Sequence, residues 1–302
     1  MSSNASGFHP AEWFWLARPF SLTAATVPVL VGTALALEDG GFAAGPFLAM
    51  LVGSLFIQAA TNMFNEFYDE QRGLDTATSV GIAGSIVSGR VHARAVLLGA
   101  LACYTVALVM GLYLIWVGGW PILLLGCLSA LGGYLYSAGP RPIAYTAASE
   151  LVVFLFMGVL IVVLAYAVQT GDFPLRVALA ATPIGALVSA ILLANNVRDM
   201  DSDRRGGRRT LPIVFGRRGG VSVYRALIAA SYVLAVILAV AGTVSPLALV
   251  VVLSLPLAAR LWRGIGASKV PERLDPVVKR TAGLHLVFGL LYTLGILVGA
   301  AV

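Results

Sequence analysis

The fold is decided by two stretches of sequence, NMFNEFYDEQRGLD at residues 62–75 and NNVRDMDSDRRGGRR at residues 195–209. Each stretch ends a long apolar run and gathers several acids. A charged side chain costs about 2.5–3.5 kcal/mol at the centre of a membrane helix, so acids beside such runs are functional candidates. Two carboxylate sets next to a lipid phase indicate oxygen ligands for Mg²⁺, which in proteins usually bridges a few carboxylates to substrate phosphates.

The rest of the chain has the composition of a membrane protein. Of the 302 residues, 59% are hydrophobic and only 11% are charged, whereas a soluble domain carries about 25% charged residues. Long apolar runs recur from Leu22 to the C-terminus, which predicts an all-α polytopic protein. A transmembrane β-barrel would show short alternating segments instead. We therefore expect one integral-membrane domain over residues 1–302.

The apolar runs predict nine spans and their orientation. If the N-terminus is cytoplasmic, every one of the 20 Lys and Arg residues except Arg176 lies in an inside segment or at its boundary. By the positive-inside rule, we expect a multi-pass protein of the cell membrane, with the acidic stretches on cytoplasmic loops and the C-terminus outside. The charge is dispersed over loops, which argues against a nucleic-acid partner. The expected spans are 20–37, 44–68, 93–117, 119–137, 148–168, 175–197, 222–242, 245–262 and 283–301.

The first acidic stretch has helical spacing. Asn62, Glu66 and Asp69 are separated by four and three residues, so on a helix they share one face, as do Asn65 and Asp69. Asp75 follows on the loop beyond the helix. We therefore expect this helix end to present amide and carboxylate oxygens to one common space.

The second stretch repeats the pattern on the same side of the membrane. Asn195, Asp199 and Asp203 form an i, i+4, i+8 stripe, and two such stripes facing each other can hold two Mg²⁺ ions with a pyrophosphate between them. Arginines clamp phosphate oxygens in bidentate fashion. For Asp201, a simple ion pair with a neighbouring arginine is the favoured interpretation. The basic candidates for phosphate contact are Arg72, Arg141, Arg198, Arg204, Arg208 and Lys279.

These residues resemble the UbiA family of intramembrane prenyltransferases. NMFNEFYD with the later Asp75 looks like the first aspartate-rich motif of that family, and the D-x-x-x-D of Asp199 and Asp203 looks like the second. The nine-span layout is also similar, so the resemblance covers essentially the whole chain. The sequence departs from the family in two places. Glu66 stands where an aspartate is usual, and the segment 81–89 lacks an arginine that relatives often have.

Softer matches indicate one subgroup of the family, whose members prenylate 1,4-dihydroxy-2-naphthoate in menaquinone biosynthesis. The NExxDxxxGxD form of the first motif looks like this subgroup. The other similar segments are ARPFSLTAATVPVLVGTALA, SAGPRPIAYTAASE, NNVRDMDSDRRGGRRTLPIVFG and DPVVKRTAGLHLVFGLL.

The resemblance implies Mg²⁺-dependent transfer of a polyprenyl group from its diphosphate to an aromatic acceptor. Asn65, Asp69, Asp199 and Asp203 would hold the metal, and the product would be demethylmenaquinone. Ionisation of the diphosphate gives an allylic cation, which needs a cavity shielded from water. The apolar tail requires that this cavity, within the nine-helix bundle, open to lipid.

Several uncharged or isolated residues are further candidates. Aromatic faces can stabilise a cation, and the candidates are Tyr68, Tyr134, Tyr136 and Tyr145, although core packing is a competing role for each. Glu150, a lone acid at the start of the fifth span, can orient the acceptor hydroxyl or act as a base. The competing role for Glu150 is that of a buried, hydrogen-bonded acid.

Other functions remain open from the sequence. The same chemistry suits 4-hydroxybenzoate, a tocopherol-type or haem acceptor, or a glycerol-phosphate lipid. A nine-span transporter would place charges through the membrane depth and break helices at the midplane, whereas the acids here cluster at one face. Neither the prenyl chain length nor the oligomeric state follows from the sequence.

Overall fold

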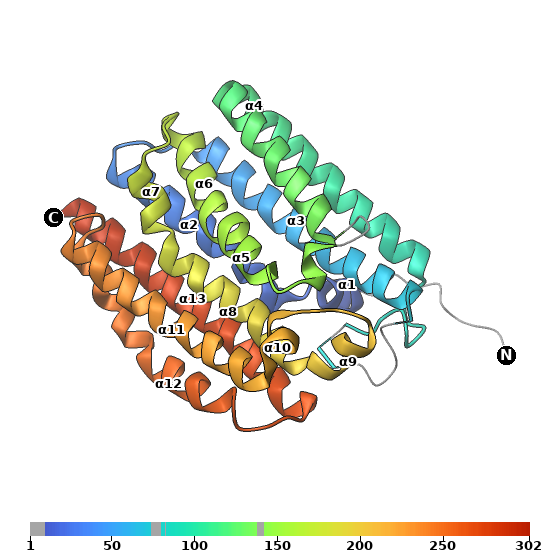
Figure 1. Ribbon diagram of the computed structural model, residues 1–302. Coiled ribbons are helices and arrows are strands. Elements are labelled where there is room, and N and C mark those ends of the chain that lie inside the picture. Colours follow the sequence, from blue (N-terminus) through green and yellow to red (C-terminus); the bar gives the residue numbers. More distant parts are fainter. Residues whose placement is uncertain (1–9, 74–79, 82, 138–141) are drawn as a thin grey trace.

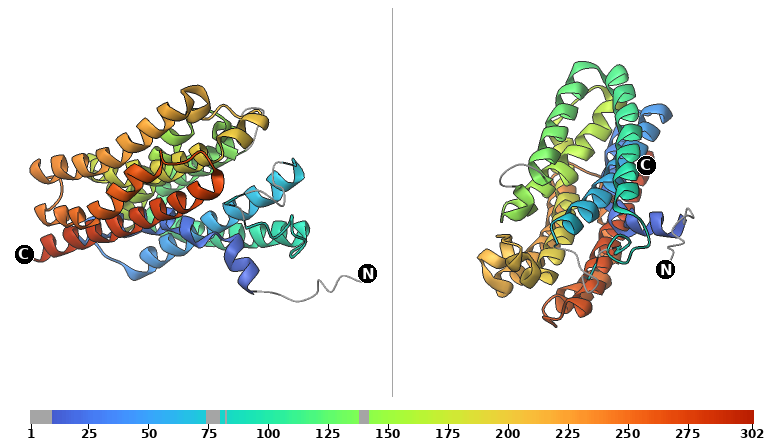
Figure 2. Two further views of the ribbon diagram at one scale, coloured as in Figure 1. Left: turned by 90° about the horizontal axis from the view of Figure 1, so that it is seen from below. Right: turned by 90° about the vertical axis from the view of Figure 1, so that its right-hand side faces the viewer.

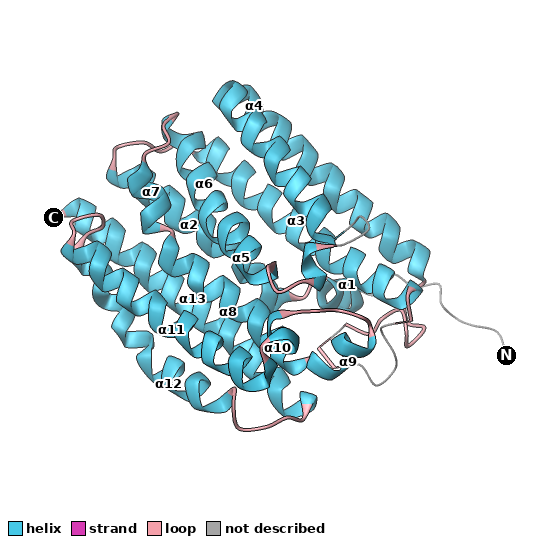
Figure 3. Ribbon diagram, in the orientation of Figure 1, coloured by secondary structure: helices cyan, strands magenta, loops and turns pink. Residues whose placement is uncertain are grey.

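The computed structural model describes residues 10–73, 80–81, 83–137 and 142–302, and these residues form helices and connecting loops (Figures 1 and 3). The helices are α1 (Pro10–Leu16), η1 (Pro19–Leu22), α2 (Thr23–Glu38), α3 (Ala44–Gln71), α4 (Ala93–Ser137), η2 (Ile143–Tyr145), α5 (Ser149–Val153), η3 (Phe154–Leu160), α6 (Ile161–Thr170), α7 (Leu175–Ala180), α8 (Thr182–Arg198), α9 (Met200–Arg205), α10 (Leu211–Val214), α11 (Gly216–Val240), η4 (Pro246–Ser254), α12 (Leu255–Gly264) and α13 (Pro271–Ala301).

The expected all-α membrane architecture is confirmed, and the count of nine spans is approximate. Eight helical segments of the described chain are long and apolar enough to cross a membrane. One of them, α4, has 45 residues, which at about 1.5 Å per residue is twice the length that a bilayer needs. Gly119 interrupts it with φ 71° and ψ −159°, and the chain turns back there (Figure 2). Because of this turn, α4 supplies the predicted third and fourth spans.

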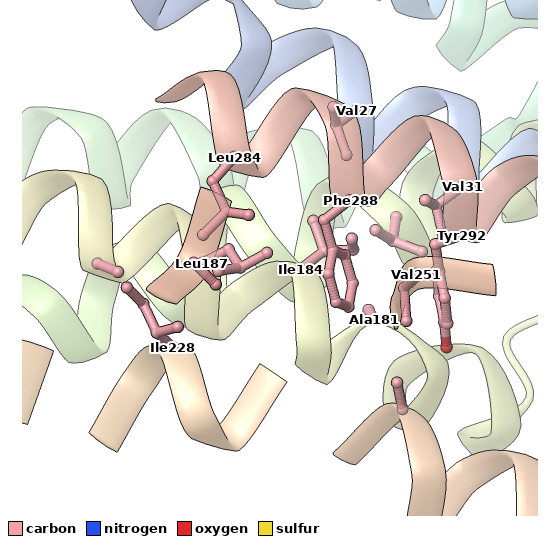
Figure 4. Packing of buried hydrophobic residues seen from close by; sticks show 14 of the residues in the cluster. Val27, Val31, Ala181, Ile184, Leu187, Ile228, Val251, Leu284, Phe288 and Tyr292 are labelled. Atoms are coloured by element: carbon pink, nitrogen blue, oxygen red, sulfur yellow. The ribbon is translucent and has the colours of Figure 1, made fainter. Parts of the chain in front are cut away.

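The bundle has a buried centre and a lipid-facing edge. In the span formed by α7 and α8, 78% of an apolar stretch of 18 residues is buried inside the protein, whereas the corresponding share for α4 is 17%. The α8 helix therefore lies at the centre of the bundle, where most of its neighbours are apolar. Figure 4 shows its packing, in which Phe288 and Tyr292 of α13 lie among residues from α2 and α8. The Tyr292 hydroxyl, which is costly to bury without a partner, donates to the Ala180 carbonyl at 3.1 Å.

Two helices of the centre approach each other through glycines. Gly158 lies in η3, a π-helical turn between α5 and α6, and a Cβ added there would collide with the Gly185 backbone of α8. A Cβ on Gly185 would in turn meet the Phe154 ring. The extra residue that a π-turn accommodates shifts the register of the helix. This shift lies in the segment that follows Glu150.

Two details of the predicted elements are wrong. The second acidic stripe does not lie on one helix, because α8 ends at Arg198 and α9 begins at Met200, with Asp199 at φ −92° and ψ 7° between them. The last helix begins at Pro271, well before the predicted residue 283. Proline suits a first helical turn because its missing N–H has no partner there. Apolar patterning locates only the part of such a helix that lies in lipid.

Candidate active site

The two acidic stretches meet at one end of the bundle, where Arg208 contacts a carboxylate from each. Its Nη1 donates to Oδ1 of Asp203 at 2.9 Å, and its Nη2 donates to Oδ1 of Asp69 at 3.4 Å. Asp69 lies in the last turn of α3, and Asp203 lies in α9. The structure thus joins two acids and one arginine that the sequence predicted for the same site.

Tyr145 forms the next part of the site. The Arg208 guanidinium lies over its ring at 4.7 Å from the centroid. Arg72, which caps the end of α3, donates from Nη1 to the Tyr145 hydroxyl at 2.7 Å, and the Arg209 backbone N–H donates to the Tyr145 carbonyl at 2.7 Å. The segment η2 therefore places the Tyr145 ring in contact with two arginines, Arg72 and Arg208, beside the carboxylates.

Arg198 organises a second charged group. Its Nε and Nη2 donate to the two carboxylate oxygens of Asp199, each at 2.7 Å, and its Nη1 donates to Oδ1 of Asp275 at 2.8 Å. Lys279 pairs with the other Asp275 oxygen at 2.7 Å. Gly81, with φ +80°, packs against the Arg198 guanidinium, where a Cβ would collide. The predicted residues Arg198, Asp199 and Lys279 thus belong to one network.

Glu66 and Asn62 hydrogen-bond the segments that surround the site. Both Glu66 oxygens accept backbone hydrogen bonds from the loop before α4, from Ser85 at 2.8 Å and Ala83 at 3.1 Å. Asn62 donates to the Ala17 carbonyl at 2.7 Å and also to a hydroxyl of η1. Both side chains are buried. Their polar atoms therefore tie together three segments of the chain.

Glu150 lies in a buried polar group next to these networks. Asn196 donates from Nδ2 to its Oε1 at 2.8 Å, and Ser149 donates to its Oε2 at 3.0 Å. The Ser189 hydroxyl donates to the Glu150 backbone carbonyl at 2.8 Å. Tyr136 is near enough to interact electrostatically with both Glu150 and Arg208. Glu150 thus has the hydrogen bonds of a buried acid and lies close to the charged site.

Burial disfavours the ionised form of the Asp203 side chain. It raises the pKa of the Asp203 carboxyl to about 6, Arg208 opposes the rise, and Asp199 adds to it. A divalent cation would stabilise the ionised form more strongly than one guanidinium does. The described residues contain no group of three or more His, Cys, Asp or Glu side chains close enough to bind a metal. A Mg²⁺ ion that takes one or two carboxylates and completes its shell with phosphate and water oxygens nevertheless fits this donor set.

The remaining predicted residues are placed as follows. Asn65 is exposed near the end of α3, and Asn195 is half-buried in α8. Asp75 and Arg141 lie outside the described residues. Sequence reasoning missed Asp275 as a functional residue, although its i, i+4 spacing from Lys279 was a usable signal.

Arg18 contributes a further cation. Its Nη2 lies 3.7 Å from Glu66, and its Nε is buried without a hydrogen-bond partner. Among the described residues, Arg18 is the one that is not glycine and yet has a positive φ, of 51°. It also precedes Pro19, and a residue before proline favours extended backbone. Such strain clusters at functional sites. The sequence carried no signal for this backbone conformation.

Comparison with known proteins gives consistent matches. The sequence matches the UbiA prenyltransferase family over residues 25–273. It is 41% identical over 283 residues to the 1,4-dihydroxy-2-naphthoate octaprenyltransferase of Bacillus subtilis (strain 168), covering 94% of this chain and 91% of that protein. It is 32% identical over 298 residues to human UbiA prenyltransferase domain-containing protein 1, covering 96% of this chain and 85% of that protein.

Solved structures share the fold. A UbiA homolog from Archaeoglobus fulgidus bound to GPP and Mg²⁺ superposes with a TM-score of 0.65 at 19% identity, covering 93% of this chain and 99% of that one. The apo UbiA homolog from Aeropyrum pernix K1 gives a TM-score of 0.68 at 19% identity, covering 91% of this chain and 97% of that one. At this level of identity, the likeness concerns the arrangement of helices.

Proposed function

Because this chain belongs to the UbiA prenyltransferase family, we propose that it transfers a polyprenyl group from polyprenyl diphosphate to 1,4-dihydroxy-2-naphthoate, with Mg²⁺ as cofactor. The acceptor is supported by the 41% identical relative, which is named for that reaction. The metal is supported by the homolog solved with GPP and Mg²⁺. The observation that carries the proposal is the joining of Asp69 and Asp203 by Arg208.

The charged residues divide into metal ligands and phosphate contacts. We assign Asp69, Asp199 and Asp203 to the metal, with Asn65 beside them, and bound Mg²⁺ would neutralise charge on the departing diphosphate. Arg72 and Arg208 flank Tyr145, and guanidinium groups suit phosphate oxygens. Asp75 is proposed to act on the phosphate through the metal. The further proposed phosphate contacts are Arg141, Asn195, Arg198 and Lys279. Asn62 and Glu66 hold the surrounding segments in place.

The reaction balances without a redox cofactor. The C–O bond of the prenyl diphosphate breaks, and diphosphate leaves with the electron pair. The resulting allylic carbon bonds to the ring carbon that carries the carboxylate, CO₂ is lost, and the ring regains aromaticity as the quinol of demethylmenaquinone. The Tyr145 ring lies beside Arg208, and an aromatic ring at this position can stabilise positive charge.

We further propose that Glu150 orients an acceptor hydroxyl. A Glu150→Gln enzyme keeps the size of the side chain and a hydrogen bond from Asn196 but loses the anion, so kcat should fall while the affinity for prenyl diphosphate is kept. Steady-state kinetics with each substrate varied in turn tests this. Unchanged kinetics would leave Glu150 with a purely structural role.

The enzyme is proposed to lie in the cell membrane with the carboxylate end facing the cytoplasm. The bias of Lys and Arg supports this orientation. The polyprenyl diphosphate and the aromatic acceptor are its proposed partners, together with the bilayer. A cavity that opens to lipid beside the site remains a prediction.

Activity of the purified protein tests the function. Protein in detergent is supplied with Mg²⁺, a radiolabelled polyprenyl diphosphate, and either 1,4-dihydroxy-2-naphthoate or 4-hydroxybenzoate. We expect lipophilic labelled product only with dihydroxynaphthoate and only with divalent metal. Product only with hydroxybenzoate would overturn the proposed acceptor but keep the chemistry. A requirement for ATP would contradict the mechanism.

A further inference from the structure

A groove that does not include the carboxylates of the acidic stretches lies between α11 and α12. Its volume is about 600 Å³, within the size range of small-molecule sites. Ala229 and Tyr232 of α11 line one side, and Ala259 and Trp262 of α12 line the other, with Arg263 at one end. The Tyr232 hydroxyl is paired with Ser254 at 2.6 Å. The lining is therefore almost entirely apolar.

The two arginines at the groove are held in place by backbone atoms. Arg225 donates from Nε to the Trp262 carbonyl at 2.9 Å, and its guanidinium lies 5.8 Å from the centroid of the Trp262 ring. Arg263 donates from Nε to the Ala259 carbonyl at 3.2 Å. The ion pairs found in the described part of the chain use other cations. Two positive charges therefore stand without a carboxylate at one end of an apolar groove.

We propose that this groove binds one anionic phospholipid. Its acyl chain would lie along the groove, which spans about 12 Å between Leu255 and Arg263 at 1.5 Å per residue. Its phosphate would contact Arg263 and Arg225, at the end of the bundle that also carries the acidic stretches. Tryptophan and arginine together suit the headgroup level of a membrane. Two unneutralised cations favour a lipid with net negative charge over a zwitterionic one.

Quenching of Trp262 fluorescence tests the proposal directly. The full chain is reconstituted in phosphatidylcholine bilayers that contain a minor fraction of either phosphatidylglycerol or phosphatidylcholine with brominated acyl chains. The contribution of Trp262 to the fluorescence is the difference in signal between the native protein and the Trp262→Phe variant. We expect this contribution to be quenched more by the brominated anionic lipid than by the zwitterionic one at equal mole fraction.

Three variants separate a site from general attraction to a basic surface. Arg263→Gln should abolish the excess quenching by phosphatidylglycerol, and Ala259→Leu should do the same by filling the groove with the charges kept. Arg94→Gln, an exposed arginine of α4, removes the same charge elsewhere and should keep the excess. Equal quenching by both lipids in the native protein, or an excess that survives in both groove variants, would overturn the proposal.

Discussion

Arg208 holds two carboxylates that would otherwise repel each other. Asp203 is buried and receives the shorter hydrogen bond, whereas Asp69 retains a quarter of its side-chain exposure and lies 3.4 Å from the guanidinium. Burial of like charges costs free energy unless a cation compensates. Arg208 therefore compensates the charge of the two carboxylates that the proposed function assigns to the metal.

Replacing Asp69 tests this arrangement. In Asp69→Asn, the amide keeps the shape of the side chain but loses the charge that is proposed to bind metal, so we expect kcat to fall by about 10²–10³, as for loss of one preorganised electrostatic contact. Asp201→Asn is the matched control, because Asp201 is exposed in the same acidic stretch. Mg²⁺-dependent prenyl transfer is the measurement. Equal activity of Asp69→Asn and the native enzyme would refute the metal assignment.

Single residues show where sequence reasoning reached its limit. Spacing on a helix predicted that Asn62, Glu66 and Asp69 share one face, because that depends only on local geometry. It could not tell that Glu66 accepts hydrogen bonds from Ser85 and Ala83, because that contact depends on the path of a loop. The partner of a charged side chain is a tertiary property.

At the scale of elements, Glu66 ties the loop before α4 to α3. In Glu66→Gln the amide nitrogen cannot accept, so at least one of the two backbone bonds is lost, at about 1.5–3 kcal/mol for a charged acceptor. We expect hydrogen exchange at the Ala83 and Ser85 amides to accelerate about ten- to hundredfold. Glu70→Gln, one turn further along α3, should leave both amides protected. Unchanged exchange in Glu66→Gln would show that the loop is held by other contacts.

The approach of η3 to α8 depends on glycine. Gly158→Ala places a methyl group against the Gly185 backbone, and we expect overpacking of about 1–3 kcal/mol. The thermal unfolding midpoint in detergent should drop, whereas Gly133→Ala, which meets nothing within 4 Å, should leave it unchanged. A stable Gly158→Ala would mean that the helices separate at little cost. Apolar runs in the sequence predicted both helices, but neither the π-turn nor this contact, because both arise from packing.

The whole molecule has an asymmetric charge distribution. The expected cation of the opposite face, Arg176, is neutralised by Glu38 at 2.7 Å and Asp39 at 2.6 Å. The unpaired positive charge therefore gathers at the end that carries the acidic stretches. This asymmetry follows from the distribution of charged residues along the chain, so the sequence is enough to predict an orientation, whereas the side-chain networks depend on tertiary contacts.

Cysteine labelling in intact cells tests the orientation. In a background without Cys103 and Cys127, Val302→Cys should react with a membrane-impermeant maleimide, because the C-terminus is expected outside. Lys269→Cys, in the loop between α12 and α13, should react only after the cells are permeabilised. The opposite labelling pattern would reverse the predicted topology.

The bridge made by Arg208 also bears on how a reaction cycle closes. On the proposed function, its guanidinium exchanges carboxylate oxygens for phosphate oxygens when the donor arrives, and takes the carboxylates back when diphosphate departs. Product release is then a swap of ligands around one cation. The carboxylates of the two stretches then have a cationic partner at each stage. Release of diphosphate therefore does not leave their mutual repulsion uncompensated.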